Sequence, residues 1–158
     1  MQKLNLPEYA FRTKMDNGRP LIFDLIRKKF VVQTPEEWVR QNFIQYLKRE
    51  KKYPESLMAV EKQLIINGKQ RRFDLLIYLR NGQPHLIAEF KAPNVKITQD
   101  AFDQVVRYNM ALRVERVIVS NGLQHFVCEI DYANNSYSYL HEVPEFCERC
   151  RVDGQGFS

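Results

Sequence analysis

Cysteine is scarce in this chain, which has three among its 158 residues. Cys128, Cys147 and Cys150 are too few and too unevenly spaced for a disulfide framework, so we expect a reducing compartment. Cys147 and Cys150, with His141 nearby, could supply three zinc ligands, or they could be plain thiols. No second Cys-x-x-Cys pair follows to complete a zinc site.

Long apolar runs are also missing, and no stretch is long enough to span a membrane. The first residues contain no apolar segment of the kind that secretory signals have, so we expect a cytoplasmic protein that does not bind membranes. No repeat, low-complexity tract or linker is visible, and we expect a single domain over residues 1–158. It would comprise an irregular arm (1–20), a core (21–130) and a C-terminal strand and tail (131–158).

Positive charge is abundant and lies mostly in the first half of the chain. Residues 1–80 hold 17 Lys and Arg against 9 Asp and Glu, while residues 81–158 hold 7 against 10. A surface of this kind attracts polyanions, because Lys and Arg that neutralise phosphates release condensed counterions. Nucleic acid is therefore the expected partner, although a solvated basic face would give the same count.

Two Asn-Gly dipeptides between apolar runs, at residues 67–68 and 81–82, predict two β-hairpins. With two-residue loops, the first hairpin places Glu61 opposite Asp74, and the second places Asp74 opposite Glu89. Three carboxylates would then form one row across three antiparallel strands, where like charges repel each other. A divalent cation or a shared proton is expected to relieve that repulsion. The same register pairs Phe73 with Phe90 on the other face of the sheet.

Two helices are predicted by their start signals. Thr34 followed by proline should begin a helix that runs to about Lys51, and Thr98 should begin a second that ends near Arg113. Apolar runs predict further strands at 117–120, 123–130 and 137–140, and residues 86–120 predict a β-α-β crossover. The expected fold is α/β, with a mixed central sheet, an antiparallel meander, one crossover and flanking helices.

The residues that could carry chemistry lie on the second hairpin and the second helix. Glu89 and Lys91 are two apart on one strand and therefore face the same side. A carboxylate there could share a metal with Asp74, while the ammonium could orient water or stabilise a phosphate. Gln104 and Tyr108, four residues apart, lie on one helical face. The alternative is structural: Asp74 and Glu89 could form surface salt bridges, and Tyr108 could belong to the core.

These residues together resemble a known pattern. Glu37 on the first helix, Asp74 on a strand, Glu89-Phe90-Lys91 on the next strand and Gln104-x-x-x-Tyr108 on the following helix resemble the PD-(D/E)XK nuclease superfamily in its Gln-x-x-x-Tyr variety. The chain is more closely similar to the N-terminal nuclease-like domain of type I restriction enzyme R subunits, in a free-standing form. This resemblance covers residues 21–130 and includes the context words TPEEWVR (34–40), RRFD (71–74) and EFKAP (89–93).

The resemblance implies a restriction-endonuclease-like core that hydrolyses nucleic acid, with DNA favoured, using Mg²⁺ or Mn²⁺ and no nucleotide cofactor. The metal ligands would be Asp74, Glu89 and the backbone carbonyl of Phe90. Lys91 would position water, and Tyr108 would stiffen the face on which it lies. The implied catalytic residues are Glu37, Asp74, Glu89, Lys91 and Gln104. The implied nucleic-acid-binding residues are Arg40, Arg71, Arg72 and Tyr108.

Two carboxylates keep alternative interpretations. Glu37 would be an accessory acidic ligand acting through water, but its place three residues after Thr34 also fits a capping box. Glu61 could be a second-metal ligand or an ion-pair partner of Lys62 or Arg72.

One departure from the R subunits concerns their motor. The sequence contains no G-x-x-x-x-G-K-[ST] loop and has no room for helicase domains, so ATP-driven translocation is not expected of it. Other restriction or defence subunits are expected partners. The competing hypothesis is a catalytically silent module of the same fold that binds nucleic acid or joins a complex.

Overall fold

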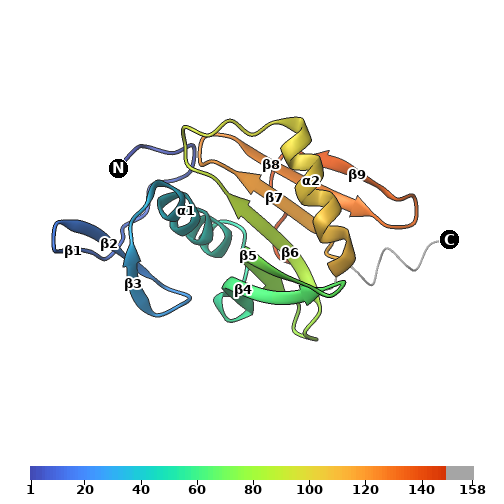
Figure 1. Ribbon diagram of the computed structural model, residues 1–158, viewed down its shortest axis with the longest axis horizontal. Helices are drawn as coiled ribbons and strands as arrows, with labels where there is room; N and C mark the ends of the chain where they lie inside the picture. Colours follow the sequence, from blue (N-terminus) through green and yellow to red (C-terminus); the bar gives the residue numbers. More distant parts are fainter. Residues whose placement is uncertain (149–158) are drawn as a thin grey trace.

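The structure, a computed structural model, describes residues 1–148 and contains two sheets and two α-helices (Figure 1). The smaller sheet has the order β1 (Thr13–Asp16), β2 (Arg19–Asp24), β3 (Lys29–Val32). The larger sheet has the order β4 (Met58–Ile66), β5 (Lys69–Tyr78), β6 (Pro84–Phe90), β7 (Arg116–Ser120), β8 (His125–Asp131), β9 (Ser136–Leu140). All its neighbouring strands are antiparallel except β6 and β7, which are parallel. The predicted mixed sheet and meander are therefore confirmed.

Both predicted helices are present, and both have the predicted caps. α1 (Pro35–Arg49) begins after Thr34, whose Oγ1 accepts the backbone N–H of Glu37 at 3.1 Å. α2 (Gln99–Asn109) begins after Thr98 in the same way and forms the crossover from β6 to β7. Short 3₁₀ helices lie at η1 (Glu55–Leu57) and at η2 (Met110–Leu112), which extends α2.

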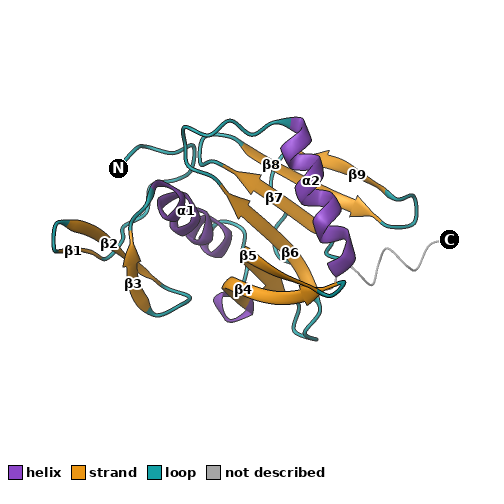
Figure 2. Cartoon of the chain, in the orientation of Figure 1, coloured by secondary structure: helices purple, strands orange, loops and turns teal. Residues whose placement is uncertain are grey.

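The two helices cover opposite faces of the larger sheet (Figure 2). On one face, α1 contributes apolar side chains such as Phe43 to a buried cluster with Leu75 and Phe90. On the other face, α2 contributes Phe102 to a second cluster that includes Leu76. Each helix thus removes one face of the sheet from water, and the strands between them are buried on both faces. The result is a three-layer α/β/α arrangement.

The first hairpin has the predicted turn. Asn67 and Gly68 both have positive φ, at 51° and 75°, as a type I′ turn requires. Ile66 pairs with Lys69, and the pairing continues along both strands. Glu61 therefore lies opposite Asp74 in register, although its own φ of 56° takes it out of the ladder.

The second hairpin reaches the predicted register by a different turn. Only Gly82 has positive φ, and its N–H donates to the Leu79 carbonyl at 2.9 Å, so the loop has three residues rather than two. A shift between Ile77 and Tyr78 offsets the extra residue. As a result, Leu75 pairs with Ala88 as predicted.

Two local predictions were wrong. Phe73 packs in the α2 cluster while Phe90 packs in the α1 cluster, so the two rings do not share a face. The reason is that the pairing of β4 with β5 is interrupted at Glu61 and Asp74. On the two sides of this interruption, alternate side chains of each strand point to opposite faces of the sheet. The arm at residues 1–20 is not irregular throughout, because β1 and the start of β2 fall within it.

The remaining expectations concern membranes and cysteines. Within residues 1–148, no helix combines the length and the apolar character needed to cross a membrane. Cys128 is a buried free cysteine. Burial raises the pKa of its thiol to about 12, so the neutral thiol is favoured over the thiolate. Cys147 is disulfide-bonded, contrary to the expected thiol and zinc ligand, and Cys150 lies outside the described residues.

Candidate active site

Asp74 and Glu89 lie next to each other where β5 and β6 separate. The backbone ladder between these strands begins at Leu75 and Ala88. One residue further out, the Asp74 side chain replaces the missing backbone partner, because its Oδ2 accepts the N–H of Phe90 at 2.8 Å. This bond holds the Asp74 carboxylate against the end of β6, beside Glu89. The predicted pair of acids is therefore formed.

Both acids are destabilised in their charged forms. Burial, followed by the neighbouring charge of Asp74, raises the pKa of Glu89 to about 7. Burial also raises the pKa of Asp74, although the Phe90 N–H and the Arg40 guanidinium oppose that rise. Two carboxylates that are partly buried and mutually repelling form a site that a cation would stabilise.

The charge of Lys91 acts on both acids. It follows the last residue of β6, and its backbone N–H donates to the Ser120 carbonyl at 2.9 Å, which fixes its place beside β7. Its ammonium opposes the rise in the pKa of Asp74 and of Glu89, so its positive charge acts on both carboxylates. Lys91 itself is exposed and can reach a bound molecule.

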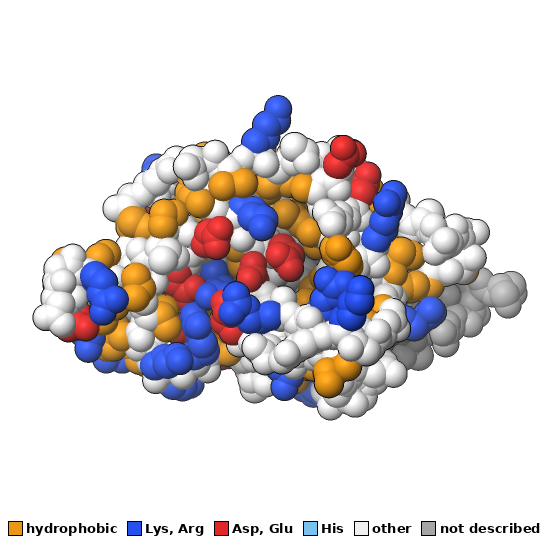
Figure 3. All heavy atoms as spheres, viewed as in Figure 1, with side chains coloured by type: hydrophobic (Ala, Val, Ile, Leu, Met, Phe, Trp, Pro, Cys, Tyr) orange, Lys and Arg blue, Asp and Glu red, His pale blue; other side chains and the backbone are white. Residues whose placement is uncertain are grey.

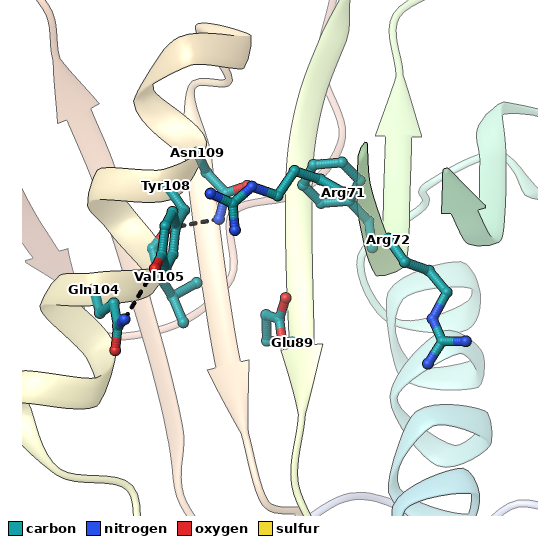
Figure 4. Close-up of a pocket in the computed structure, with 8 residues that line it drawn as sticks. Arg71, Arg72, Glu89, Gln104, Val105, Tyr108 and Asn109 are labelled. Carbon is teal, nitrogen blue, oxygen red and sulfur yellow. Dashed lines mark hydrogen bonds between the residues drawn. The ribbon is translucent and has the colours of Figure 1, made fainter. Parts of the chain in front are cut away.

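Gln104 and Tyr108 form the opposite wall of this site (Figure 4). The Gln104 Nε2 donates to the Tyr108 hydroxyl at 3.1 Å, and the Arg71 guanidinium lies 4.1 Å from the centre of the Tyr108 ring. Glu89 points into the hollow of about 300 Å³ that these residues line, whereas Arg72 extends away from Tyr108. Tyr108 is 46% exposed, so the alternative of a core tyrosine is wrong.

Glu37 is not free to act as an accessory ligand. Its carboxylate binds the guanidinium groups of Arg27 and Arg40, and it also accepts from the Gln41 amide at 3.1 Å. The predicted capping box is only half formed, because Thr34 caps the helix while the Glu37 side chain turns to the arginines.

Glu61 is likewise bound by arginines. Its two oxygens contact Arg40 Nη1 at 2.7 Å and Arg72 Nε at 3.0 Å. Of the two interpretations of Glu61, the structure favours the ion pair with Arg72 over the second-metal ligand.

Arg40 lies between the acids instead of facing nucleic acid. Only 7% of it is exposed, and its Nη1 is 4.0 Å from Asp74 Oδ1 as well as bonded to Glu61. The prediction that Arg40 contacts nucleic acid is therefore wrong. Its guanidinium places a positive charge between Asp74 and Glu61.

Comparisons with known proteins identify the family and support the fold. Residues 35–144 match the family model described as "Type I restriction enzyme R protein N terminus". The chain belongs to that family. A fragment described as an HsdR subunit of a type I restriction enzyme from Vibrio vulnificus YJ016 has a similar fold, with a TM-score of 0.51 and 20% identity. The match covers 70% of this chain and 23% of that one. A search of curated proteins found no match.

Within this R-protein N-terminal domain, sequence reasoning missed Glu36. It lies in the first turn of α1, lines a second hollow together with Asp74, and raises the pKa of Glu89 through its charge. The sequence places two glutamates side by side at the helix start, and the orientation of the helix decides which one faces the site. Here Glu36 remains exposed beside the acids while Glu37 is buried.

Of the three carboxylates that the hairpin registers predicted in one row, Asp74 and Glu89 form a pair, while Glu61 is bound by Arg40 and Arg72. Among residues 1–148, no group of three or more His, Cys, Asp or Glu side chains is placed to hold a metal ion. Mg²⁺ often takes one or two carboxylates and keeps several waters, so the pair fits one such ion with a backbone carbonyl added. The donor set is one of hard oxygens, as Mg²⁺ and Mn²⁺ prefer.

The raised pKa of Glu89 predicts how stability depends on pH when EDTA keeps cations away. Because the folded pKa of about 7 lies above the ordinary value of 4.5, stability should fall as pH rises from about 4.5 to about 7. The loss should be on the order of 1 to 3 kcal/mol. Urea unfolding at pH 5 and pH 8 should show this loss in the wild type and not in Glu89→Gln. An equal pH dependence in the two proteins would contradict the assignment.

Proposed function

We propose that this domain hydrolyses phosphodiester bonds of nucleic acid, with DNA as the expected substrate, and that it does so with one Mg²⁺ or Mn²⁺ ion. The observation that carries the proposal is the pair of partly buried carboxylates, Asp74 and Glu89, with the ammonium of Lys91 beside them. Among the ion pairs of residues 1–148, Asp74 has a 4.0 Å approach to Arg40 and Glu89 has none, so surface salt bridges do not account for the pair.

The ion would be held by Asp74, Glu89 and the backbone carbonyl of Phe90. When bound, such an ion lowers the pKa of its water and offsets charge on phosphate oxygens. Lys91, which is near both acids, can hydrogen-bond the attacking water or a phosphate oxygen. Glu37 and Glu61 take no part as ligands, since their oxygens are bound to arginines.

The other residues of the site are placed to bind the substrate. Arg71 and Tyr108 pack face to face at the rim of the hollow and present a guanidinium and a phenol to solvent. The Gln104 amide, held by Tyr108, can orient a phosphate oxygen. Arg72 is 64% exposed in its side chain and lies between the two hollows, so it can contact a nucleic-acid backbone as well as Glu61.

The family gives this activity a restriction or defence context, in which other restriction subunits are the proposed partners. The chain spans 23% of the Vibrio fragment, and it lacks the nucleotide-binding loop of a translocation motor. The proposal therefore concerns hydrolysis alone.

A silent module of the same fold is the second candidate. The observation that favours it is that the Arg40 guanidinium forms ion pairs with Glu37 and Glu61, so these acids are not free to bind a metal ion. Such a module would bind nucleic acid and leave it intact under all cation conditions.

Lys91→Ala is expected to reduce cleavage of plasmid or single-stranded DNA by about 10² to 10⁴ fold, because a positioned proton-transfer or charge-stabilising group has that effect. The assay compares Mg²⁺, Mn²⁺ and EDTA. Lys96→Ala is the matched control, since Lys96 is an exposed lysine in the same loop, and its activity should equal that of the wild type. Equal cleavage by Lys91→Ala and the wild type would reject this site, and binding without cleavage would favour the silent module.

A further inference from the structure

The small sheet β1–β3 is separate from the six-stranded sheet that carries the candidate active site. It lies before residues 35–144, the part that matches the family model, and Figure 1 shows it standing out beside α1. It is firmly attached, because Ile22 is fully buried and Arg27 joins Asp24 of β2 to Glu37 of α1. The first turn of α1, which carries Glu37, lines one of the hollows at the site. The sheet is thus fixed relative to the candidate active site.

The outer face of this sheet alternates cations with apolar groups. Arg12 lies 4.5 Å from the ring centre of Phe23, and Lys14 lies 4.4 Å from that of Phe30. The register places Lys14 next to Leu21, which in turn pairs with Val32, and Val32 is 42% exposed. These side chains form a continuous surface of positive charge over aromatic and aliphatic groups.

The cations of this surface outnumber its acids, since Arg12, Lys14 and Arg19 share the face with one acid, Asp16, which lies opposite Arg19 in the register. Among residues 1–148, no ion pair within 4.0 Å joins a carboxylate to Arg12, Lys14 or Arg19. Asp24 is fully buried and bonded to Arg27, so Asp16 is the single acid of the sheet left at the surface. The surface therefore has a net positive charge.

We propose that the outer face of the β1–β3 sheet binds the sugar–phosphate backbone of a nucleic-acid strand that extends from the candidate active site. The choice of nucleic acid as the bound polyanion rests on the proposed function. Unpaired cations bind phosphates through counterion release, and aromatic groups between them suit bases or sugars. Figure 3 shows acidic side chains gathered near the middle of one face with Lys and Arg on both sides of them. A strand crossing the acids on this face would meet Lys and Arg on either side of them.

The test is fluorescence anisotropy with a labelled oligonucleotide, as a single strand and as a duplex, in EDTA so that no cleavage occurs. Lys14→Gln/Arg19→Gln should bind about tenfold more weakly at physiological salt. The slope of log K against log salt should fall in magnitude by about 1.4 for the single strand and about 1.8 for the duplex, since two phosphate contacts are lost. The melting temperature should stay near that of the wild type, because both side chains are exposed.

The matched control is Lys52→Gln/Arg113→Gln, which removes two positive charges elsewhere. Lys52 follows the far end of α1 and Arg113 follows the far end of α2. Their loss should weaken binding less than threefold. Equal weakening by both double variants would overturn the proposal, because net charge alone would then explain it. Unchanged binding by the sheet variant, or a changed oligomeric state with unchanged binding, would also overturn it.

Failure of the proposed function would give a different result. Asp74→Asn should stop cleavage while it leaves binding to the sheet intact. A protein that cleaves nothing but whose binding depends on Lys14 and Arg19 would retain the sheet proposal and lose the enzymatic one.

Discussion

Asp74→Asn is expected to reduce metal-dependent cleavage by about 10³ fold or more, because it removes one of two charged groups proposed to hold the ion. Asparagine has nearly the same shape, and its Oδ1 can still accept the Phe90 N–H that Asp74 accepts at 2.8 Å. The fold should therefore persist. In EDTA the variant should melt at a higher temperature than the wild type, since the repulsion between Asp74 and Glu89 is gone.

The control for this substitution is Asp100→Asn, which makes the same change of charge at an exposed position in the first turn of α2. It should cleave at the wild-type rate and melt slightly lower, because an acid there favours the helix dipole. Added Mn²⁺ should raise the melting temperature of the wild type and of Asp100→Asn but not that of Asp74→Asn. Full activity in Asp74→Asn would remove Asp74 from the mechanism.

Arg40→Ala is expected to lower the free energy of unfolding by about 3 to 5 kcal/mol, the largest stability effect we predict. Arg40 is 7% exposed and binds Glu37 and Glu61, so its removal leaves carboxylates partly uncompensated inside the protein. Urea unfolding monitored by circular dichroism measures the change.

Arg49→Ala is the matched control, because Arg49 lies on the same helix and its Nε donates to the Gln45 amide at 2.9 Å near the surface. Its cost should stay within about 0.5 kcal/mol. Glu37→Gln/Arg40→Met should be less destabilised than Arg40→Met alone, since it removes a charge from each side of the pair. A loss below 1 kcal/mol in Arg40→Ala would contradict the conclusion that the ion pairs of this arginine stabilise the fold.

The elements that the sequence predicted well are those with local causes. Thr34 and Thr98 cap helices because their hydroxyls reach backbone N–H groups three residues on, and nothing distant is needed. The turn at Asn67 and Gly68 is equally local, since both residues tolerate positive φ. These signals were enough to predict the meander, the crossover and the adjacency of Asp74 and Glu89.

The register of the second hairpin was predicted correctly, but the turn that was expected to produce it was not. Its three-residue loop would by itself have moved Asp74 one position away from Glu89. The shift between Ile77 and Tyr78 cancels that displacement. A bulge has no clear local signal here, so the prediction of register depended on the apolar pattern of the strands as much as on the turn.

What the sequence could not predict is the path of long side chains. The family resemblance implied that Arg40 binds nucleic acid, but its guanidinium reaches from α1 to β4 and β5, where it contacts Glu61 and the Asp74 carbonyl. Glu61 contacts the Arg40 guanidinium because the Glu61 backbone is in a left-handed conformation, which is rare outside glycine and asparagine. This conformation turns Glu61 out of the strand pairing. These contacts arise from tertiary packing, and they decide that Glu37 and Glu61 are not free acids.

The most direct test of the central claim is anomalous diffraction from crystals grown with Mn²⁺ and an uncleaved oligonucleotide, at a pH above 7 where Glu89 is ionised. We expect a single Mn²⁺ ion that contacts the carboxylates of Asp74 and Glu89 and the carbonyl of Phe90, with Arg40 still bound to Glu37 and Glu61. An ion bound instead at Glu37 and Glu61, or cleavage by a protein that holds no ion between Asp74 and Glu89, would contradict it.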